Sequence, residues 1–166
     1  MTDKRIDISL FCDGESNALA DLFTASVHGI DDELYSPAQK SAWASLKIDY
    51  PFWQTRFAKT KPWVARMAGQ PVGFAELICF PEKSAGYIDC FYVHPDAQGQ
   101  GVGRALLNQL IHKAKEQGLT HLTTDASLAA VPFFSAFGFV EGQRNTHHRA
   151  GEVLVNVTMS RALHVS

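Results

Sequence analysis

Residues 94–107, HPDAQGQGVGRALL, place three glycines at alternate positions where an apolar helical pattern begins. Glycine in the first turn of a helix costs on the order of 1 kcal/mol relative to alanine, so a need for bare backbone must outweigh that cost. Free N–H groups at a helix N-terminus bind anions together with the helix dipole, and glycine lets a phosphate approach the backbone. Arg104 adds a cation. The run therefore predicts a loop that binds a phosphate-bearing ligand.

The segments that flank this loop predict a crossover connection. Residues 86–94 and 120–125 are rich in β-branched or aromatic residues, and residues 101–117 carry apolar side chains at helical spacing. A strand, a helix and a second strand in this order make the two strands parallel, joined by a right-handed connection. Ligands gather at the carboxyl ends of such strands, which is where the glycine loop lies.

The remaining segments complete a mixed sheet. Residues 62–93 predict three antiparallel strands, separated by the turn compositions AGQP and PEKSAG. Helices are expected after Ser16 as a capping residue and after Ser36, which opens a capping box with proline at the first helical position. Residues 50–59 suit one more short helical turn, and the last strands form a hairpin. The order β-α-α-β-β-β-α-β-α-β-β predicts an α/β fold of the mixed-sheet (α+β) kind, with about seven strands and about four helices.

The composition excludes several classes of protein. The chain has 166 residues, which suits one domain over 1–166 and is short for two. Its net charge of −2, with mixed signs, gives no electrostatic footprint for nucleic acid or an acidic membrane. Three widely spaced cysteines without a CxxC pair suit a reducing compartment, and no apolar run reaches the ~20 residues of a membrane helix or resembles a signal peptide. We expect a cytoplasmic protein without nucleic-acid or membrane partners.

Two common phosphate-binding patterns do not fit the loop. A dinucleotide fingerprint, GxGxxG, needs a third glycine where this chain has Arg104 and Leu106, and a P-loop needs GxxxxGK[ST]. The segment 98–103, QGQGVG, instead matches the Q/R-x-x-G-x-G/A signature of the GCN5-related N-acetyltransferases (GNAT). FYVHPDAQGQGVGRALL resembles the strand–loop–helix motif of that family, and FFSAFGF resembles its FYxxxGF segment. The order of elements agrees from residue 4 to about residue 161, so the resemblance covers nearly the whole chain.

The resemblance implies an acetyl-CoA-dependent N-acetyltransferase, in which a primary amine of a small molecule or protein attacks the thioester directly. In the family, the loop holds the pyrophosphate, and the pantetheine amides bond to the open edge of the preceding strand as an added strand would. No metal is implied, and a monomer or a homodimer is expected. Carried over to this chain, the cofactor-binding residues are Phe91, Tyr92, Val93, Gln98, Gly99, Gln100, Gly101, Val102, Gly103, Arg104, Ser127 and Phe134.

Two carboxylates are candidates for the catalytic base. Asp89 interrupts an otherwise apolar strand two residues before the expected acetyl-binding edge, and Glu76 interrupts the neighbouring β-run. Burial raises the pKa of a carboxyl group, which suits proton abstraction near neutral pH. Strict alternation predicts that Asp89 shares one strand face with Tyr87, Phe91 and Val93, and that Ile88, Cys90 and Tyr92 share the other. An ion pair or a solvated sheet face is the alternative for both carboxylates.

One departure from the family bears on catalysis. Phe134 occupies the position of the tyrosine that usually acts as general acid, and a phenyl ring has no proton to give. A thiol with a pKa near ~8.5 leaves well as thiolate without an acid, and water, Tyr87 or Ser135 are alternative donors. The departure leaves open an acyl-CoA-binding sensor or interaction module with weak catalysis.

The sequence does not identify the acceptor. His147, His148 and Arg149 lie near the turn of the final hairpin, either exposed to solvent or on the rim of the acceptor site. Adjacent histidines on a strand point to opposite faces, so this pair is poorly placed to bind a metal.

Overall fold

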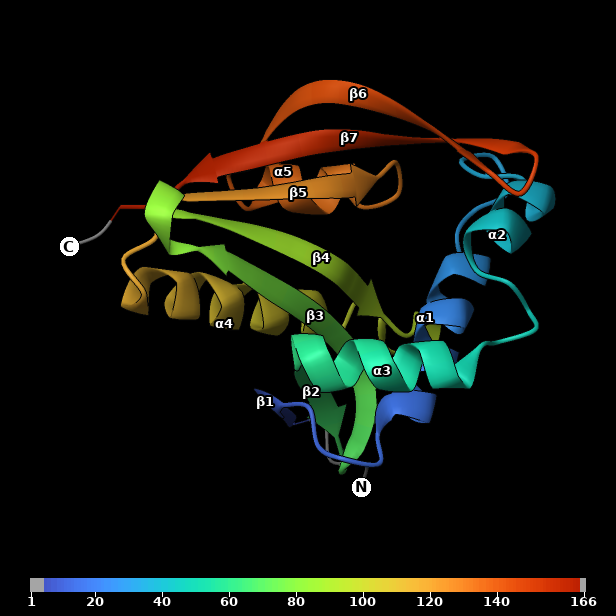
Figure 1. Ribbon diagram of the computed structural model, residues 1–166, viewed down its shortest axis with the longest axis horizontal. Helices are drawn as coiled ribbons and strands as arrows, with labels where there is room; N and C mark the ends of the chain where they lie inside the picture. Colours follow the sequence, from blue (N-terminus) through green and yellow to red (C-terminus); the bar gives the residue numbers. More distant parts are fainter. Residues whose placement is uncertain (1–4, 165–166) are drawn as a thin grey trace.

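The chain folds around one mixed sheet, which a computed structural model describes for residues 5–164 (Figure 1). The seven strands lie in the order β1-β2-β3-β4-β5-β7-β6, and β4 and β5 are the parallel pair. The mixed sheet predicted from the sequence is therefore confirmed. Its strands are β1 (Ile6–Leu10), β2 (Trp63–Met67), β3 (Gln70–Phe80), β4 (Ala85–Val93), β5 (His121–Ser127), β6 (Val140–Arg149) and β7 (Glu152–Ala162).

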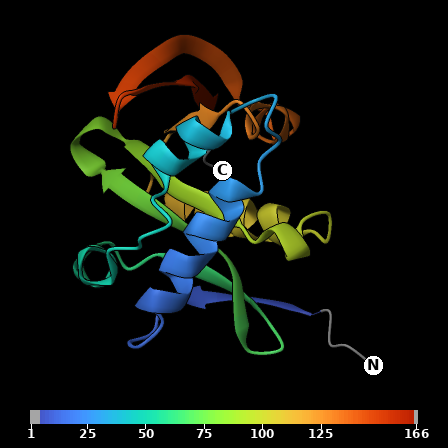
Figure 2. The same cartoon turned by 90° about the vertical axis from the view of Figure 1, so that its right-hand side faces the viewer.

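Helices cover both faces of the sheet. Helices α1 and α3 pack on one face, and α2 lies against β7 beside them (Figure 2). Helix α4 and the short helix α5 cover the other face. We call these the α1 face and the α4 face. The helices are α1 (Ser16–His28), α2 (Pro37–Trp43), α3 (Tyr50–Thr60), α4 (Val102–Glu116) and α5 (Val131–Ala136).

The described residues contain five α-helices rather than about four, because residues 50–60 form a complete helix. Asp49 caps this helix by accepting the Phe52 N–H at 3.1 Å, and a proline occupies its first turn. The capping box at Ser36 is confirmed, since its hydroxyl accepts the Gln39 N–H and the Gln39 side chain accepts the Ser36 N–H. The expected cap at Ser16 is wrong.

Ser16 is already inside α1, and the preceding residue, Glu15, performs a different task. The Glu15 carboxylate accepts the Cys12 N–H at 2.9 Å and the Arg66 Nε–H at 2.9 Å, which joins the start of α1 to β2. Burial alone would raise the pKa of Glu15, but the hydrogen bonds from Arg66 and Cys12 outweigh it and lower that pKa.

The described chain contains no helix long and apolar enough to cross a membrane.

The lowered pKa predicts that Glu15 stabilises the fold in a pH-dependent manner. Glu15→Gln is expected to lower the free energy of unfolding by about 2 kcal/mol at pH 7, because a charge-assisted, largely buried interaction is lost. A carboxyl group whose pKa is lowered by folding stabilises above its unfolded pKa, and this contribution disappears as the pH falls through the folded value. Urea unfolding at pH 7 and pH 3 should therefore show a deficit that shrinks in acid.

The exposed helix residue Glu116, whose partners are Lys113 and His112, provides the matched control. Glu116→Gln should change the free energy of unfolding little at either pH, because exposed ion pairs contribute little. An equal deficit for Glu15→Gln at pH 7 and pH 3 would contradict the assigned role of the Glu15 charge.

Candidate functional site

The parallel strands β4 and β5 separate after four paired residues. Their ladder runs from Ala85 opposite His121 to Ile88 opposite Thr124, where the Thr124 hydroxyl donates to the Ile88 carbonyl at 2.9 Å. Beyond this point the strands diverge toward their carboxyl ends (Figure 1). The divergence leaves one edge of the β4 backbone without a neighbouring strand, at the end of the sheet where the glycine loop begins.

A β-bulge sits in β4 where the divergence begins. The register pairs Glu76 with Asp89 but Phe74 with Tyr92, so two residues of β4 oppose one residue of β3. Cys90, in the bulge, has φ of 51°, a left-handed conformation that is uncommon outside glycine. Bulges of this kind occur often beside active sites, where they redirect side chains.

The bulge makes the predicted face assignment wrong beyond Asp89. Phe91 and Val93 pack on the α4 face, whereas Cys90 and Tyr92 pack on the α1 face. Asp89 therefore shares its side of the sheet with Tyr92 and not with Phe91. The alternation rule fails here because the bulge adds one residue to β4.

A cavity of about 680 Å³, here called the loop cavity, lies between the glycine loop, the end of β4, α5 and the end of α1. Gly99 and Gly101 adopt φ of +78° and +86°, so both positions need glycine. A Cβ on Gly103 would lie 3.1 Å from the Phe133 ring, so close packing explains the third glycine. Among the predicted cofactor-binding residues, those that line this cavity are Phe91, Tyr92, Val93, Gln98, Gly99, Gly101, Val102, Gly103, Arg104 and Ser127.

Two predicted cofactor-binding residues do not line this cavity. The Gln100 side chain turns back to donate to the Asp96 carbonyl at 3.2 Å. Phe134 is 1% exposed and packs edge-on against Phe91, in the core. Cofactor contact by these two residues stays a prediction, while the neighbouring Phe133 lines the cavity wall.

The open edge of β4 includes Val93. The His94 N–H donates to the Val72 carbonyl at 2.8 Å, which makes these two residues a hydrogen-bonded pair of the antiparallel ladder. The next residue, Val93, is opposite Gly73 in a pair that does not exchange hydrogen bonds, so its N–H and carbonyl point away from β3. The Gln98 amide reaches the Val93 carbonyl at 3.4 Å. The Val93 N–H thus faces the side from which β5 has diverged.

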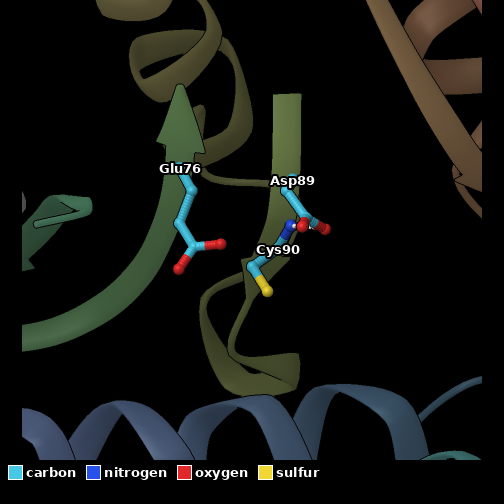
Figure 3. A group of neighbouring side chains, drawn as sticks. All are labelled: Glu76, Asp89 and Cys90. Atoms are coloured by element: carbon cyan, nitrogen blue, oxygen red, sulfur yellow. Dashed lines mark hydrogen bonds between the residues drawn. The ribbon is translucent and has the colours of Figure 1, made fainter. Parts of the chain in front are cut away.

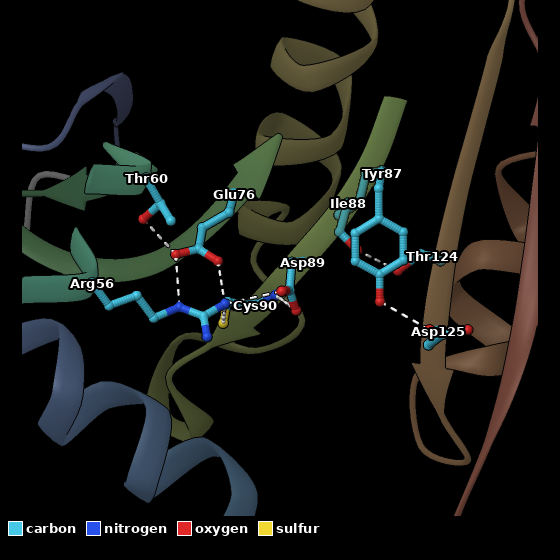
Figure 4. A network of polar contacts seen from close by, with 9 residues as sticks. All are labelled: Arg56, Thr60, Glu76, Tyr87, Ile88, Asp89, Cys90, Thr124 and Asp125. Atoms are coloured by element: carbon cyan, nitrogen blue, oxygen red, sulfur yellow. Dashed lines mark hydrogen bonds and ion pairs between the residues drawn. The ribbon is translucent and has the colours of Figure 1, made fainter. Parts of the chain in front are cut away.

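Glu76 and Asp89 lie on the neighbouring strands β3 and β4 (Figure 3) and meet around one arginine (Figure 4). Arg56, on α3, donates to Glu76 at 2.6 Å and 3.1 Å and to Asp89 at 2.9 Å. The Thr60 hydroxyl donates to Glu76 at 2.6 Å. The hydrogen bonds that Arg56 donates to Glu76 outweigh burial and raise the pKa of Arg56, which is therefore a permanent cation. Two carboxylates and one guanidinium give the cluster a net formal charge of −1.

The two carboxylates differ in their access to solvent. The Glu76 side chain is 0% exposed and lines none of the cavities described in this section, whereas the Asp89 side chain is 39% exposed. Asp89 Oδ1 accepts the Cys90 N–H at 2.9 Å, and Oδ2 accepts from Arg56. Only Asp89, of these two, presents an oxygen to a space that a substrate can enter.

Cys90 completes a group of possible metal ligands with Glu76 and Asp89, whose ligand atoms lie within 4.8 Å of one another (Figure 3). The Arg56 guanidinium lies among these atoms, 3.1 Å from the Cys90 sulfur. Burial raises the pKa of the Cys90 thiol, and the charges of Glu76 and Asp89 raise it further. The group is thus arranged around a guanidinium, and its thiol is protonated.

Two smaller cavities open on the α1 face of the sheet. The α3 cavity, of about 420 Å³, is bounded by α1, the α2–α3 segment and α3. The β7 cavity, of about 430 Å³, is bounded by β4, β5 and the β6–β7 hairpin. Both the α3 cavity and the β7 cavity are lined by Asp89, Trp43 and Arg149. Tyr92 lines all three cavities, including the loop cavity. A ligand in the loop cavity and a ligand on the α1 face therefore meet at Tyr92, beside Asp89.

Arg56 is the residue of this site that sequence reasoning missed. It lies four residues before Thr60 on α3, a spacing that places both side chains on one helix face. That spacing, set beside two unexplained strand carboxylates, was the available signal. The aromatic residues of the same helix form a stronger pattern, which predicts packing in the core and assigns no role to Arg56.

Comparison with known proteins agrees with this geometry. The family model described as "Acetyltransferase (GNAT) domain" matches residues 31–161. The chain is 39% identical over 134 residues to the uncharacterised N-acetyltransferase YafP of Escherichia coli, covering 81% of each chain. It is 31% identical over 135 residues to an aminoglycoside N(6')-acetyltransferase of Stenotrophomonas maltophilia, covering 69% of this chain and 88% of the relative.

A solved structure supports the same assignment. A GCN5-related N-acetyltransferase from Rhodopseudomonas palustris superposes with a TM-score of 0.86 at 35% identity, covering 98% of this chain and 99% of that one. The family match, the relatives and the fold agree with the divergent strands and the glycine loop. The chain is therefore an acyltransferase and belongs to the GNAT family of N-acetyltransferases.

Proposed function

We propose that this protein transfers an acetyl group from acetyl-CoA to a primary amine, which attacks the thioester directly beside Asp89. The observation that carries the proposal is the junction at Tyr92, where the loop cavity meets the two cavities of the α1 face. A donor bound along β4 and an acceptor bound on the α1 face would meet there. A PaiA N-acetyltransferase from Thermoplasma acidophilum, solved in complex with coenzyme A, shares the fold with a TM-score of 0.76.

The residues around the loop cavity fit acetyl-CoA. Gly99 and Gly101 lie in the loop that leads into α4 and put no side chain in the way of a ligand, and a Cβ built at either position would have no contact within 4 Å beyond its chain neighbours. A pyrophosphate would bind to the backbone N–H groups of this loop and the helix dipole. The Val93 N–H would hold the thioester carbonyl, and acetyl-CoA supplies an activated acetyl group. Arg104, held 6.0 Å from the Phe137 ring, adds a positive charge at the entrance.

In this proposal Asp89 is the base. It is half-exposed, so a proton taken from an ammonium group can pass on to water. The net negative charge of the Arg56 cluster attracts a cationic amine toward it. Glu76 is a positioning residue, because it binds two nitrogens of Arg56 and so fixes the guanidinium against Asp89.

The state of Cys90 favours direct attack over transfer through a cysteine. A thiolate, not a thiol, is the nucleophile in covalent catalysis. Burial and the adjacent carboxylates raise the pKa of Cys90, so its sulfur stays protonated. The acceptor amine itself is then the nucleophile.

A second candidate, an acyl-CoA-binding module with little turnover, rests on Phe134. This residue has no proton to donate, and its ring is buried. The Tyr87 hydroxyl donates to Asp125 at 2.9 Å, and Ser135 is exposed on α5 and lines none of the three cavities. Binding of acetyl-CoA with no acetylation of any amine would favour this candidate.

The proposal is tested by calorimetric titration with acetyl-CoA, with NADH as the control ligand. Gly101→Val is expected to weaken acetyl-CoA binding about a hundredfold, because a branched side chain at φ of +86° distorts the N–H groups that receive the pyrophosphate. Gly14, at φ of +93° in an exposed loop, provides the matched control, and Gly14→Val should leave binding unchanged. Failure of the wild type to bind acetyl-CoA, or equal losses in both variants, would overturn the proposal.

A further inference from the structure

The charged groups on the α1 face are unevenly partnered. The carboxylates have hydrogen bonds from the protein itself: Asp49 accepts the Phe52 N–H, Asp89 accepts from Arg56, and Asp125 accepts from Thr158 at 2.6 Å. Two cations differ. Within residues 5–164, the side chains of Lys47 and Arg149 have no hydrogen bond or ion pair.

These two cations line the spaces where the acceptor would bind. Lys47 lines the α3 cavity, and Arg149 lines both the α3 cavity and the β7 cavity. Asp89 lines the same two cavities, so the proposed base and an unpartnered guanidinium share one binding space. His147 and His148 add further N–H donors to the wall of the β7 cavity.

The hairpin that carries Arg149 is held in place by α2 and by the loop that precedes it. The Gln39 side chain of α2 donates to the Val153 carbonyl at 2.8 Å, and the Tyr35 hydroxyl donates to the Val155 carbonyl. Tyr35 also accepts the Leu128 N–H at 2.9 Å, which ties the hairpin to the loop after β5. Arg149 is therefore presented to the cavities from an anchored element, beside α2 in Figure 1.

We propose that the acceptor is an amine that also carries an anionic group, either a carboxylate or a phosphate. Its ammonium group lies at Asp89, its anionic group lies at Arg149 and Lys47, and its carbon skeleton packs on Trp43 and Tyr92. The assignment rests on the proposed acetyltransferase function and specifies its substrate class. Polycationic amines such as aminoglycosides are poor acceptors, because the free charges on the rim repel them.

The test compares amines that differ only in the anionic group. Phenylalanine is paired with phenethylamine for a carboxylate, glucosamine 6-phosphate is paired with glucosamine for a phosphate, and kanamycin serves as the polycation. Acetylation is followed by release of the CoA thiol. Binding of each amine to the protein saturated with CoA is measured separately by calorimetry, so the result does not depend on turnover.

The anionic member of at least one pair should be favoured about tenfold, in kcat/KM or in affinity, because a charge-assisted hydrogen bond contributes that much. Arg149→Gln should remove most of this preference, because it should weaken the amine that carries the anionic group much more than the partner amine that lacks it. Arg144→Gln is the matched control: Arg144 lies five residues earlier on the same strand, β6, and lines none of the three cavities.

Each outcome bears on one proposal. If acetyl-CoA binds but the amines without an anionic group or kanamycin are preferred, the proposed anionic acceptor is overturned and the acetyltransferase proposal survives. The same holds if Arg149→Gln changes nothing. If acetyl-CoA does not bind, the acetyltransferase proposal itself fails. A preference within one pair alone decides between a carboxylate and a phosphate.

Discussion

Replacing Asp89 with asparagine is expected to lower kcat/KM for amine acetylation by on the order of 10²–10³ near neutral pH, with little change in the Kd for acetyl-CoA. Asparagine keeps the size of the side chain and one of its two acceptor oxygens, so it can still accept the Cys90 N–H or the Arg56 N–H but not both. It cannot accept a proton from the amine. The loss should therefore fall on the chemical step and not on donor binding.

The pH dependence separates loss of a base from loss of structure. As the pH rises, more of the acceptor amine is already deprotonated in solution, so the Asp89→Asn variant should recover rate toward the pKa of that amine. Cys90→Ser provides the neighbouring control and should retain turnover within about threefold, since direct attack needs no thiolate. Full activity of Asp89→Asn would exclude Asp89 as the base. Inactivity of Cys90→Ser would support transfer through a cysteine intermediate instead of direct attack.

Replacing Glu76 with glutamine is expected to lower the free energy of unfolding by about 3 kcal/mol. Glu76 is 0% exposed, and both of its oxygens accept hydrogen bonds from Arg56 or Thr60. A glutamine amide places an N–H group where one of those acceptors was, and it leaves the Arg56 charge with Asp89 alone. A total stability of roughly 5–15 kcal/mol makes such a loss easy to measure by urea unfolding.

A double variant tests whether the loss comes from an uncompensated charge. Replacing Glu76 with leucine and Arg56 with methionine removes both charges and keeps apolar volume, so it should cost less than Glu76→Gln alone. Glu82→Gln, in the exposed turn before β4, is the control and should have little effect. A double variant that is less stable than the single one would mean that the ion pair itself stabilises the fold.

The crossover and the loop were predictable because their signals are local. Alternate glycines between a β-like run and an amphipathic pattern predict both a parallel pair of strands and an anion site, and the structure confirms the parallel pair. It adds that Gly99 and Gly101 have positive φ, whereas Gly103 needs space beside Phe133. Helix α3 was underestimated, because its aromatic residues weaken helix propensity while the cap at Asp49 is a single residue.

The candidate catalytic region around Glu76 and Asp89 was only partly predictable. Glu76 and Asp89 stood out as charges in apolar strands, but their pairing across β3 and β4 depends on a register that the bulge shifts. Arg56 comes from a helix distant in sequence, and no local pattern assigns it to those carboxylates. The three cavities depend on how the β6–β7 hairpin and α2 pack, which is tertiary information.

The bulge at Cys90 reverses, within β4, whether even-numbered or odd-numbered residues face α4. On its amino-terminal side, even-numbered residues such as Ile88 face α4, and on its carboxyl-terminal side odd-numbered residues such as Phe91 do. Straightening the strand with all of its residues kept would restore simple alternation from Asp89 onward and turn Tyr92 to the α4 face, away from Asp89, although no atom of either side chain had been altered. Removing Cys90 would instead take out the extra residue and leave Asp89 and Tyr92 on the same face, two positions apart. It is the extra residue, and not the identity of its side chain, that lets Asp89 and Tyr92 lie on the same face while three positions apart.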